Sequence, residues 1–363
     1  MNFYHQIALT KIKGVGPKTA RILLAQCGSV QEILETKAST LATIPGVNSK
    51  TAAEIASKNY QKATEKEIAF IKKHQIQVLW IANPDYPQKL KNCEDAPLVL
   101  YYKGNADLNK ERVVSIVGTR NATNYGRHIC EMLLEQLKPL DTTIISGLAY
   151  GIDIMAHKNA LKQQIPTIGV LGHGLDRIYP ASHREVASAM LQQGGLITEF
   201  PSDSNLDRQN FPMRNRIIAG MSDVTIVVEA ATKGGALITA EIANSYNRDV
   251  CAFPGAIDSP YSAGCNYLIK TNRAHLIRDV KDLCYLMNWE NQKVKEAIQL
   301  TLMPPELNEA QLYLYLFIQD KQQVGIDEIS RYCAWPQSKL AMVLLEMEMS
   351  GHITSLPGKI YQL

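Results

Sequence analysis

Residues 113–126, VVSIVGTRNATNYG, decide the fold of this chain. The run Val113–Val117 is the short, mostly apolar segment typical of a buried parallel strand, and Gly118 begins a turn directly after it. Thr123 and Asn124 are residue types that begin helices by accepting a hydrogen bond from a free backbone amide. The stretch therefore predicts a strand, a glycine turn and a helix, which is the repeating unit of a doubly wound α/β fold.

Six similar runs follow, separated by segments long enough for crossover helices. They are TTIISG (142–147), TIGVLG (167–172), LITEF (196–200), VTIVVEA (224–230), DVCAFPG (249–255) and HLIRD (275–279). Together with the first run they predict seven strands in a mainly parallel, doubly wound sheet. Residues 76–109, which are broken by prolines, are expected to form short connecting strands that pack onto this domain.

Glycine-rich turns follow several of these strands, and in an open α/β sheet ligands bind outside the carboxyl ends of the strands. Glycines admit close approach, amides at helix N-termini hold anionic oxygens, and arginine forks suit phosphate. An aromatic ring in the same arc would support a base by stacking. The residues that these turns and the segment before the 224–230 strand deliver to this edge are Gly118, Arg120, Thr123, Gly147, Lys158, Arg208, Phe211, Arg214, Asn215, Arg216, Lys233, Gly234, Gly235 and Thr239.

Missing motifs argue against several other classes of ligand. No G-x-G-x-x-G turn with an acidic residue ~20 positions on is present, and no P-loop motif occurs, so dinucleotide and ATPase sites are disfavoured. The seven cysteines contain no C-x-x-C pair, which argues against zinc and against a disulfide framework. No metal or cofactor is expected. With neither a signal sequence nor an apolar run of ~18 residues, the sequence predicts a cytoplasmic protein without a membrane partner.

The N-terminal part carries a repeat. Gly14-Val15-Gly16 and Gly46-Val47-Asn48 stand 32 residues apart, each between apolar helical patterns, and predict a tandem of helix-hairpin-helix elements. The turns of such elements direct free backbone amides toward DNA phosphates, although such pairs often only pack on each other. The domain boundaries that follow are a helical domain at 1–70 and the α/β domain at 71–290.

The C-terminal part predicts a winged helix at 307–363, after a linker at 291–306 that contains Pro304-Pro305. Leu312–Ile318, Ile326–Cys333 and Ser338–Ser350 have helical apolar spacing, and ITSLPGKIYQL is expected to form a hairpin. The candidate recognition helix holds Lys339 and two glutamates, a poor basic footprint for DNA. A packing or partner-binding role is the alternative.

The blocks VGTRNATNYG, ISGLAYGIDIMAH, LGHGLDRIYP, FPMRNRIIAGMSD and GGALITA occur in the order found in the DNA-processing protein A (DprA/Smf) family, which residues 84–282 resemble. The resemblance implies an extended Rossmann fold and a homodimer. It further implies a protein that binds and protects single-stranded DNA and loads a RecA-type recombinase onto it during natural transformation, without being an enzyme. In this sequence it assigns the DNA path to Arg120, His183, Arg184, Arg208, Phe211, Arg214 and Arg216. His183, Gly235-Ala236 and Asn272-Arg273-Ala274 depart from common family residues.

An enzyme is the rival interpretation. Lys233-Gly234-Gly235 with Glu241 faintly resembles the P-G-G-x-G-T-x-x-E turn of nucleoside-monophosphate phosphoribohydrolases. This sequence lacks the proline and the second-turn glycine of that motif. The candidate catalytic carboxylates would be Glu199, Glu229, Glu241 and Asp153. Glu229 is expected more often to cap or anchor a neighbouring loop than to catalyse, and Asp153 and His157 are expected more often to be structural hydrogen-bonding residues than catalysts. A nucleotide-sensing regulator is a third alternative.

Overall fold

The protein is represented by a computed structural model that describes residues 3–289, 307–356 and 360–363. The chain divides into two compact units, residues 1–290 and residues 291–363. The predicted linker at 291–306 and the predicted hairpin tip, Pro357-Gly358, lie outside the described residues.

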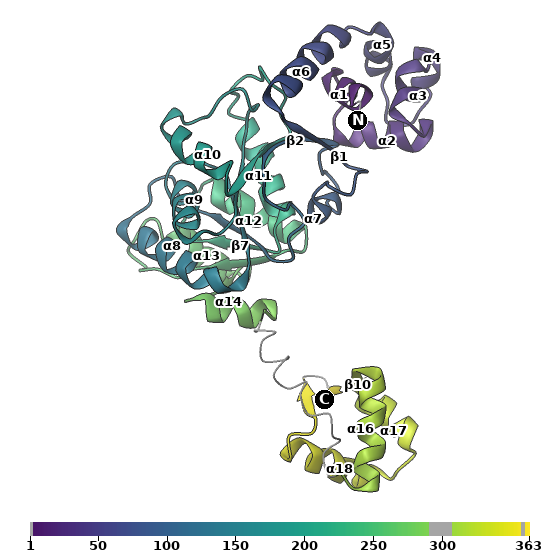
Figure 1. Ribbon diagram of the computed structural model, residues 1–363, viewed down its shortest axis with the longest axis vertical. Coiled ribbons are helices and arrows are strands. Elements are labelled where there is room, and N and C mark those ends of the chain that lie inside the picture. The colour runs from purple at the N-terminus through teal and green to yellow at the C-terminus, as the bar shows by residue number, and fades with distance from the viewer. Residues whose placement is uncertain (1–2, 290–306, 357–359) are drawn as a thin grey trace. The chain divides into compact units, whose positions relative to one another are not determined.

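A nine-stranded sheet forms the centre of the first unit, in the order β1-β2-β6-β5-β4-β3-β7-β8-β9. Figure 1 shows β1 and β2 at the side of this sheet that meets the N-terminal helices. The seven predicted strands are all present, and wherever two of them are neighbours they pair in parallel. The prediction of a doubly wound sheet is therefore confirmed. They are β3 (Val113–Val117), β4 (Thr143–Ser146), β5 (Thr167–Val170), β6 (Gly194–Thr198), β7 (Val224–Val227), β8 (Asp249–Ala252) and β9 (His275–Leu276).

Helices cover both faces of this sheet, as a buried parallel sheet requires. One face packs against α7 (Gln88–Lys91), α11 (Asn210–Met221), α12 (Gly235–Ser245) and α13 (Ala263–Lys270). The other packs against α8 (Asn124–Leu137), α9 (Ile152–Gln163), α10 (Arg184–Met190) and α14 (Val280–Met287). Every residue of β3 to β7 is buried, which explains why their sequences are such continuous apolar runs.

The proline-rich connector adds two antiparallel strands, β1 (Gln77–Trp80) and β2 (Val99–Gly104), to the edge of the sheet at β6. Side chains on a strand alternate between its faces. Leu100 and Tyr102 accordingly join the core of the sheet, whereas Val99 and Tyr101 join the core of the N-terminal helices. The two strands therefore unite the helical part and the α/β part in one compact unit.

The helical part contains two helix-hairpin-helix elements that pack on each other. The turn at Gly14 lies against Thr51, and the turn at Gly46 lies against Ile22, which belongs to the other element. Both glycines have positive φ angles, +83° and +89°, so the turns need glycine. The helices are α1 (Tyr4–Lys11), α2 (Pro17–Cys27), α3 (Val30–Glu35), α4 (Ala38–Leu41), α5 (Ser49–Ser57) and α6 (Gln61–His74).

The second unit is a winged helix with its own core. Its elements are α16 (Glu309–Lys321), β10 (Gln323–Gly325), α17 (Ile326–Cys333), α18 (Gln337–Met349), β11 (Thr354–Leu356) and β12 (Ile360–Gln362). The three predicted helices and the hairpin of β11 with β12 are confirmed. The short strand β10, which pairs with β12, was not predicted, because three residues are too few to show an alternating pattern.

Candidate nucleic-acid interface

The strand order reverses between β3 and β7, and a cavity of about 760 Å³ opens there at the carboxyl ends of the strands. This is where an open α/β sheet is expected to bind its ligand, because the helices that follow the two strands diverge to opposite faces. The cavity collects ten of the predicted site residues: Gly118, Arg120, Arg208, Phe211, Arg214, Asn215, Lys233, Gly234, Gly235 and Thr239.

A second cavity of about 580 Å³ lies beside the first, and Arg120 lines both. Arg127 and Tyr150 also line it, and half of the Tyr150 side chain is exposed. Neither residue was predicted. Both stand in the quoted glycine turns or just after them, but the sequence does not show which side chains of a turn point outward.

Three cations on the first cavity are exposed: Arg120, Arg208 and Lys233. None of them makes a hydrogen bond or an ion pair with any residue that the structure describes. Their charges are therefore available to an anionic ligand. Arg184 and Lys158 are exposed too, but they line neither cavity.

Arg214 forms the floor of the cavity and is only 4% exposed. Its Nη1 donates to the Val170 carbonyl oxygen at 3.1 Å, and its guanidinium lies against Gly147, where any side chain would collide with it. Burial lowers the pKa of Arg214 to about 10, although the nearby Asp153 carboxylate opposes the shift. Arg214 thus remains a cation at neutral pH, held by protein groups.

Arg216, two residues further along α11, points elsewhere and lines neither cavity. It makes a buried ion pair with Glu199 and donates to the Asp95 carbonyl oxygen at 2.7 Å. The two arginines lie on different sides of the helix because successive residues are about 100° apart around its axis. Asn215 lies between them and donates to the Gly235 carbonyl oxygen at 3.3 Å.

Thr123 is bound to Glu229 and holds the first turn in place. Its amide and hydroxyl donate to the two Glu229 carboxylate oxygens, at 3.0 and 2.6 Å, and the Thr123 hydroxyl caps α8 at Gly126. The predicted anchoring role of Glu229 is what this geometry shows.

His183 is buried, and its Nδ1 lies 2.9 Å from the Leu148 carbonyl oxygen. Its ring packs edge-on against Tyr150, with the centroids 4.9 Å apart. In this chain the histidine supports an exposed aromatic ring of the second cavity.

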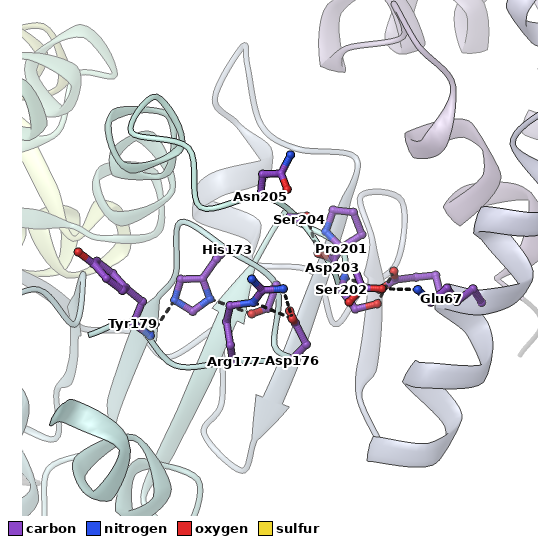
Figure 2. A network of polar contacts seen from close by, with 12 residues as sticks. Glu67, His173, Asp176, Arg177, Tyr179, Pro201, Ser202, Asp203, Ser204 and Asn205 are labelled. Atoms are coloured by element: carbon purple, nitrogen blue, oxygen red, sulfur yellow. Dashed lines mark hydrogen bonds and ion pairs between the residues drawn. The ribbon is translucent and has the colours of Figure 1, made fainter. Parts of the chain in front are cut away.

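Tyr179 is an aromatic residue of the first cavity that the prediction did not assign. Its ring is 49% exposed and lies 5.8 Å, centroid to centroid, from the ring of Phe211. The Tyr179 amide donates to His173 Nε2 at 3.3 Å, and His173 Nδ1 faces the Gly174 carbonyl oxygen at 2.8 Å (Figure 2). Burial lowers the pKa of His173, which keeps the ring neutral and able to accept this hydrogen bond.

The carboxylates expected of an enzyme are mostly engaged in structural pairs. Glu199 pairs with Arg216, Glu241 pairs with Arg273 on the surface, and Glu229 holds Thr123. Asp153 is the one of the four that lines the first cavity, where it is buried near Arg214. Burial raises the pKa of the Asp153 carboxyl, whereas Arg214 lowers it.

Two further findings concern the described residues as a whole. Within ranges 3–289, 307–356 and 360–363, no group of three or more His, Cys, Asp or Glu side chains could hold a metal ion. No helix in this described part of the chain is long and apolar enough to cross a membrane.

A family model, DNA recombination-mediator protein A, matches residues 77–288. The chain belongs to this family. A model of the DprA winged helix domain matches residues 303–359, and a tandem of SAM-like helix-hairpin-helix elements matches residues 7–58, so both flanking predictions are confirmed.

Individual members of the family are similar to this chain in sequence and in structure. Protein Smf of Synechocystis is 31% identical over 98% of this chain and 97% of its own length. The X-ray structure of DNA processing protein A from Streptococcus pneumoniae superimposes with a TM-score of 0.70, at 32% identity over 78% of this chain and 98% of that one. DNA processing protein A from Helicobacter pylori matches with a TM-score of 0.53 and 29% identity over 61% of this chain and 97% of that one, and its structure is titled for a single-stranded DNA binding mode.

Proposed function

We propose that this chain binds single-stranded DNA in the crevice between β3 and β7 and acts as a binder rather than an enzyme. The observation that carries the proposal is the set of three exposed, unpaired cations, Arg120, Arg208 and Lys233, around a cavity that also presents the Tyr179 ring. Cations that replace counterions along a strand, with rings on which bases stack, suit single strands of any sequence.

The family assignment supports a wider role in DNA processing. We propose that the protein protects incoming single strands and loads a RecA-type recombinase onto them during natural transformation, in the cytoplasm and as a homodimer. A RecA-type recombinase given single strands covered by a single-strand binding protein should hydrolyse ATP faster when this chain is added. Sedimentation equilibrium tests the dimer separately.

The direct test is fluorescence anisotropy with a labelled strand of about 30 nucleotides and a duplex of equal length, at about 50 and about 200 mM salt. We expect tight binding of the single strand that weakens steeply with salt, and weaker binding of the duplex. Equal affinity for both, or no binding, would contradict the proposal.

A phosphoribohydrolase remains the second candidate because Asp153 lies in the cavity. Release of free adenine from AMP tests it in parallel. We expect none, since the Asp153 carboxylate is buried near the Arg214 guanidinium and the other candidate carboxylates have structural partners.

A further inference from the structure

The segment between β6 and α11, residues 199–209, delivers Arg208 to the cavity, and the N-terminal helical part holds its beginning. Glu67 of α6 accepts a hydrogen bond from the Ser202 amide at 3.0 Å and another from the Ser202 hydroxyl at 2.9 Å (Figure 2). The two residues are 135 positions apart in the sequence. Lys11 of α1 adds an ion pair to the same carboxylate at 2.9 Å.

Glu67 is only 3% exposed, so its charge is costly unless every oxygen has a partner. The three donors satisfy both oxygens. Such a buried, charge-assisted contact holds a loop far more firmly than a surface pair does. The neighbouring pair of Lys66 with Asp203 is of that weaker kind, with side chains 75% and 60% exposed.

Two hydrogen-bonded turns restrict the chain between Ser202, which Glu67 holds, and Arg208. The Ser204 amide donates to the Pro201 carbonyl oxygen at 3.3 Å, which forms a turn around Ser202. A second turn follows, in which the Asn210 side chain at the start of α11 donates to the Asn205 carbonyl oxygen at 3.1 Å. Arg208 therefore lies between one anchor on the helical part and one on α11.

The same anchored segment also lies against the loop that carries Tyr179, another residue that lines the cavity. Gly174 lies so close to the Pro201 carbonyl oxygen that a Cβ added there would be 2.4 Å from it. His173 Nδ1 lies 2.8 Å from the carbonyl oxygen of Gly174, its neighbour in the chain. His173 Nε2 accepts a hydrogen bond from the Tyr179 amide (Figure 2).

We propose that Glu67 is a positioning residue for DNA binding: through Ser202 it holds Arg208 at the cavity, so the helical part raises affinity without contacting DNA. This inference rests on the proposed function. It also predicts an effect of unusual sign. Removing a negative charge from a protein strengthens its long-range attraction to DNA, whereas loss of Glu67 should weaken binding.

The experiment measures single-strand affinity by anisotropy for the full chain carrying Glu67→Ala, with Glu65→Ala as the matched control. Glu65 is an exposed carboxylate on the same helix, so its replacement removes the same charge. We expect Glu67→Ala to weaken binding about fivefold and to lower the slope of log affinity against log salt by about 0.7, the share of one phosphate contact. Glu65→Ala should leave affinity unchanged or slightly raised.

A double-mutant cycle separates positioning from general destabilisation. In an Arg208→Ala background the effect of Glu67→Ala should fall below about twofold, and in an Arg120→Ala background it should persist in full. An equal loss in both backgrounds, tighter binding by Glu67→Ala, or no effect of Arg208→Ala itself would overturn the inference.

Circular dichroism and the melting temperature establish that each variant is folded. If Glu67→Ala does not fold, Ser202→Ala serves instead, because it removes one donor and leaves the pair of Lys11 with Glu67 intact. It should weaken binding about twofold, with the same dependence on Arg208. A parent protein that fails to bind single strands contradicts the proposed function, whereas a parent that binds and does not depend on Glu67 contradicts this inference alone.

Discussion

Arg120 lines both cavities, and it makes no hydrogen bond or ion pair with a residue that the structure describes. Arg120→Ala should therefore weaken single-strand binding about five- to tenfold and leave the unfolding midpoint unchanged. Anisotropy at moderate salt, with urea unfolding of the same variant, measures both. Unchanged affinity would remove Arg120 from the DNA path.

Arg214 is predicted to behave in the opposite way. Because it is buried against Gly147 and near Asp153, Arg214→Ala leaves that carboxylate without its buried cation. We expect a loss of stability of about 3 kcal/mol, seen as a lower urea midpoint with an unchanged m-value. A variant with full stability and weakened DNA binding would instead make Arg214 a direct ligand.

His157 should make the protein sensitive to acid. It is fully buried, its Nδ1 lies 2.7 Å from the Thr167 hydroxyl, and burial lowers its pKa to about 3. The unfolded chain, with an ordinary histidine pKa near 6.5, binds a proton that the folded state refuses. Stability is therefore complete above about pH 7 and falls as the pH drops toward 3.

The test compares the parent with His157→Asn, which retains a hydrogen-bonding group for Thr167. Between pH 7 and pH 5 the parent should lose about 2 kcal/mol more stability than the variant, measured by urea unfolding at each pH. Parallel pH profiles would show that His157 does not carry the effect.

At the scale of elements, α11 combines two tasks on two sides. Arg214 points to the cavity, and Arg216 pairs with Glu199 away from it. We expect the double replacement Arg216→Met with Glu199→Leu to retain single-strand affinity within about twofold, because no buried charge is left unpaired. A loss above tenfold in this folded variant would show that Arg216 contacts DNA, as the family resemblance implies.

The elements of the α/β part were predictable because buried parallel strands leave continuous apolar runs in the sequence. The site was predictable as a place, since the turns after Val117 and Val227 must meet where the strand order reverses. What each side chain does there was not. Arg120, in the turn after β3, and Arg214, in α11, are the same residue type on one cavity, and only burial against Val170 and Gly147 separates a free cation from a structural one.

Long-range contacts account for the rest. Nothing near Glu67 in the sequence indicates that it binds Ser202. The short strands within residues 76–109 were predicted, but their sequence does not show that they join two cores. The turns that contain Tyr179 and Tyr150 were predicted, but the exposure of these two rings was not, because exposure depends on how neighbouring loops pack.

At the scale of the whole molecule, the two units have separate cores, and every residue that lines the two cavities belongs to the first. In the second unit, Lys339 of the candidate recognition helix lies 4.5 Å from the Trp335 ring centroid. The proposed single-strand site therefore lies within the first unit.

A chain that ends at residue 290 should therefore unfold in one cooperative transition and bind single-stranded DNA within about threefold of the full chain. Calorimetry measures the first property and anisotropy the second. The salt slope should also be unchanged, since the same phosphate contacts remain. If truncation instead costs more than tenfold in affinity and lowers the slope while the shortened chain stays folded, then the winged helix supplies phosphate contacts of its own, and the poor basic footprint of α18 would have to be offset by another face of that unit.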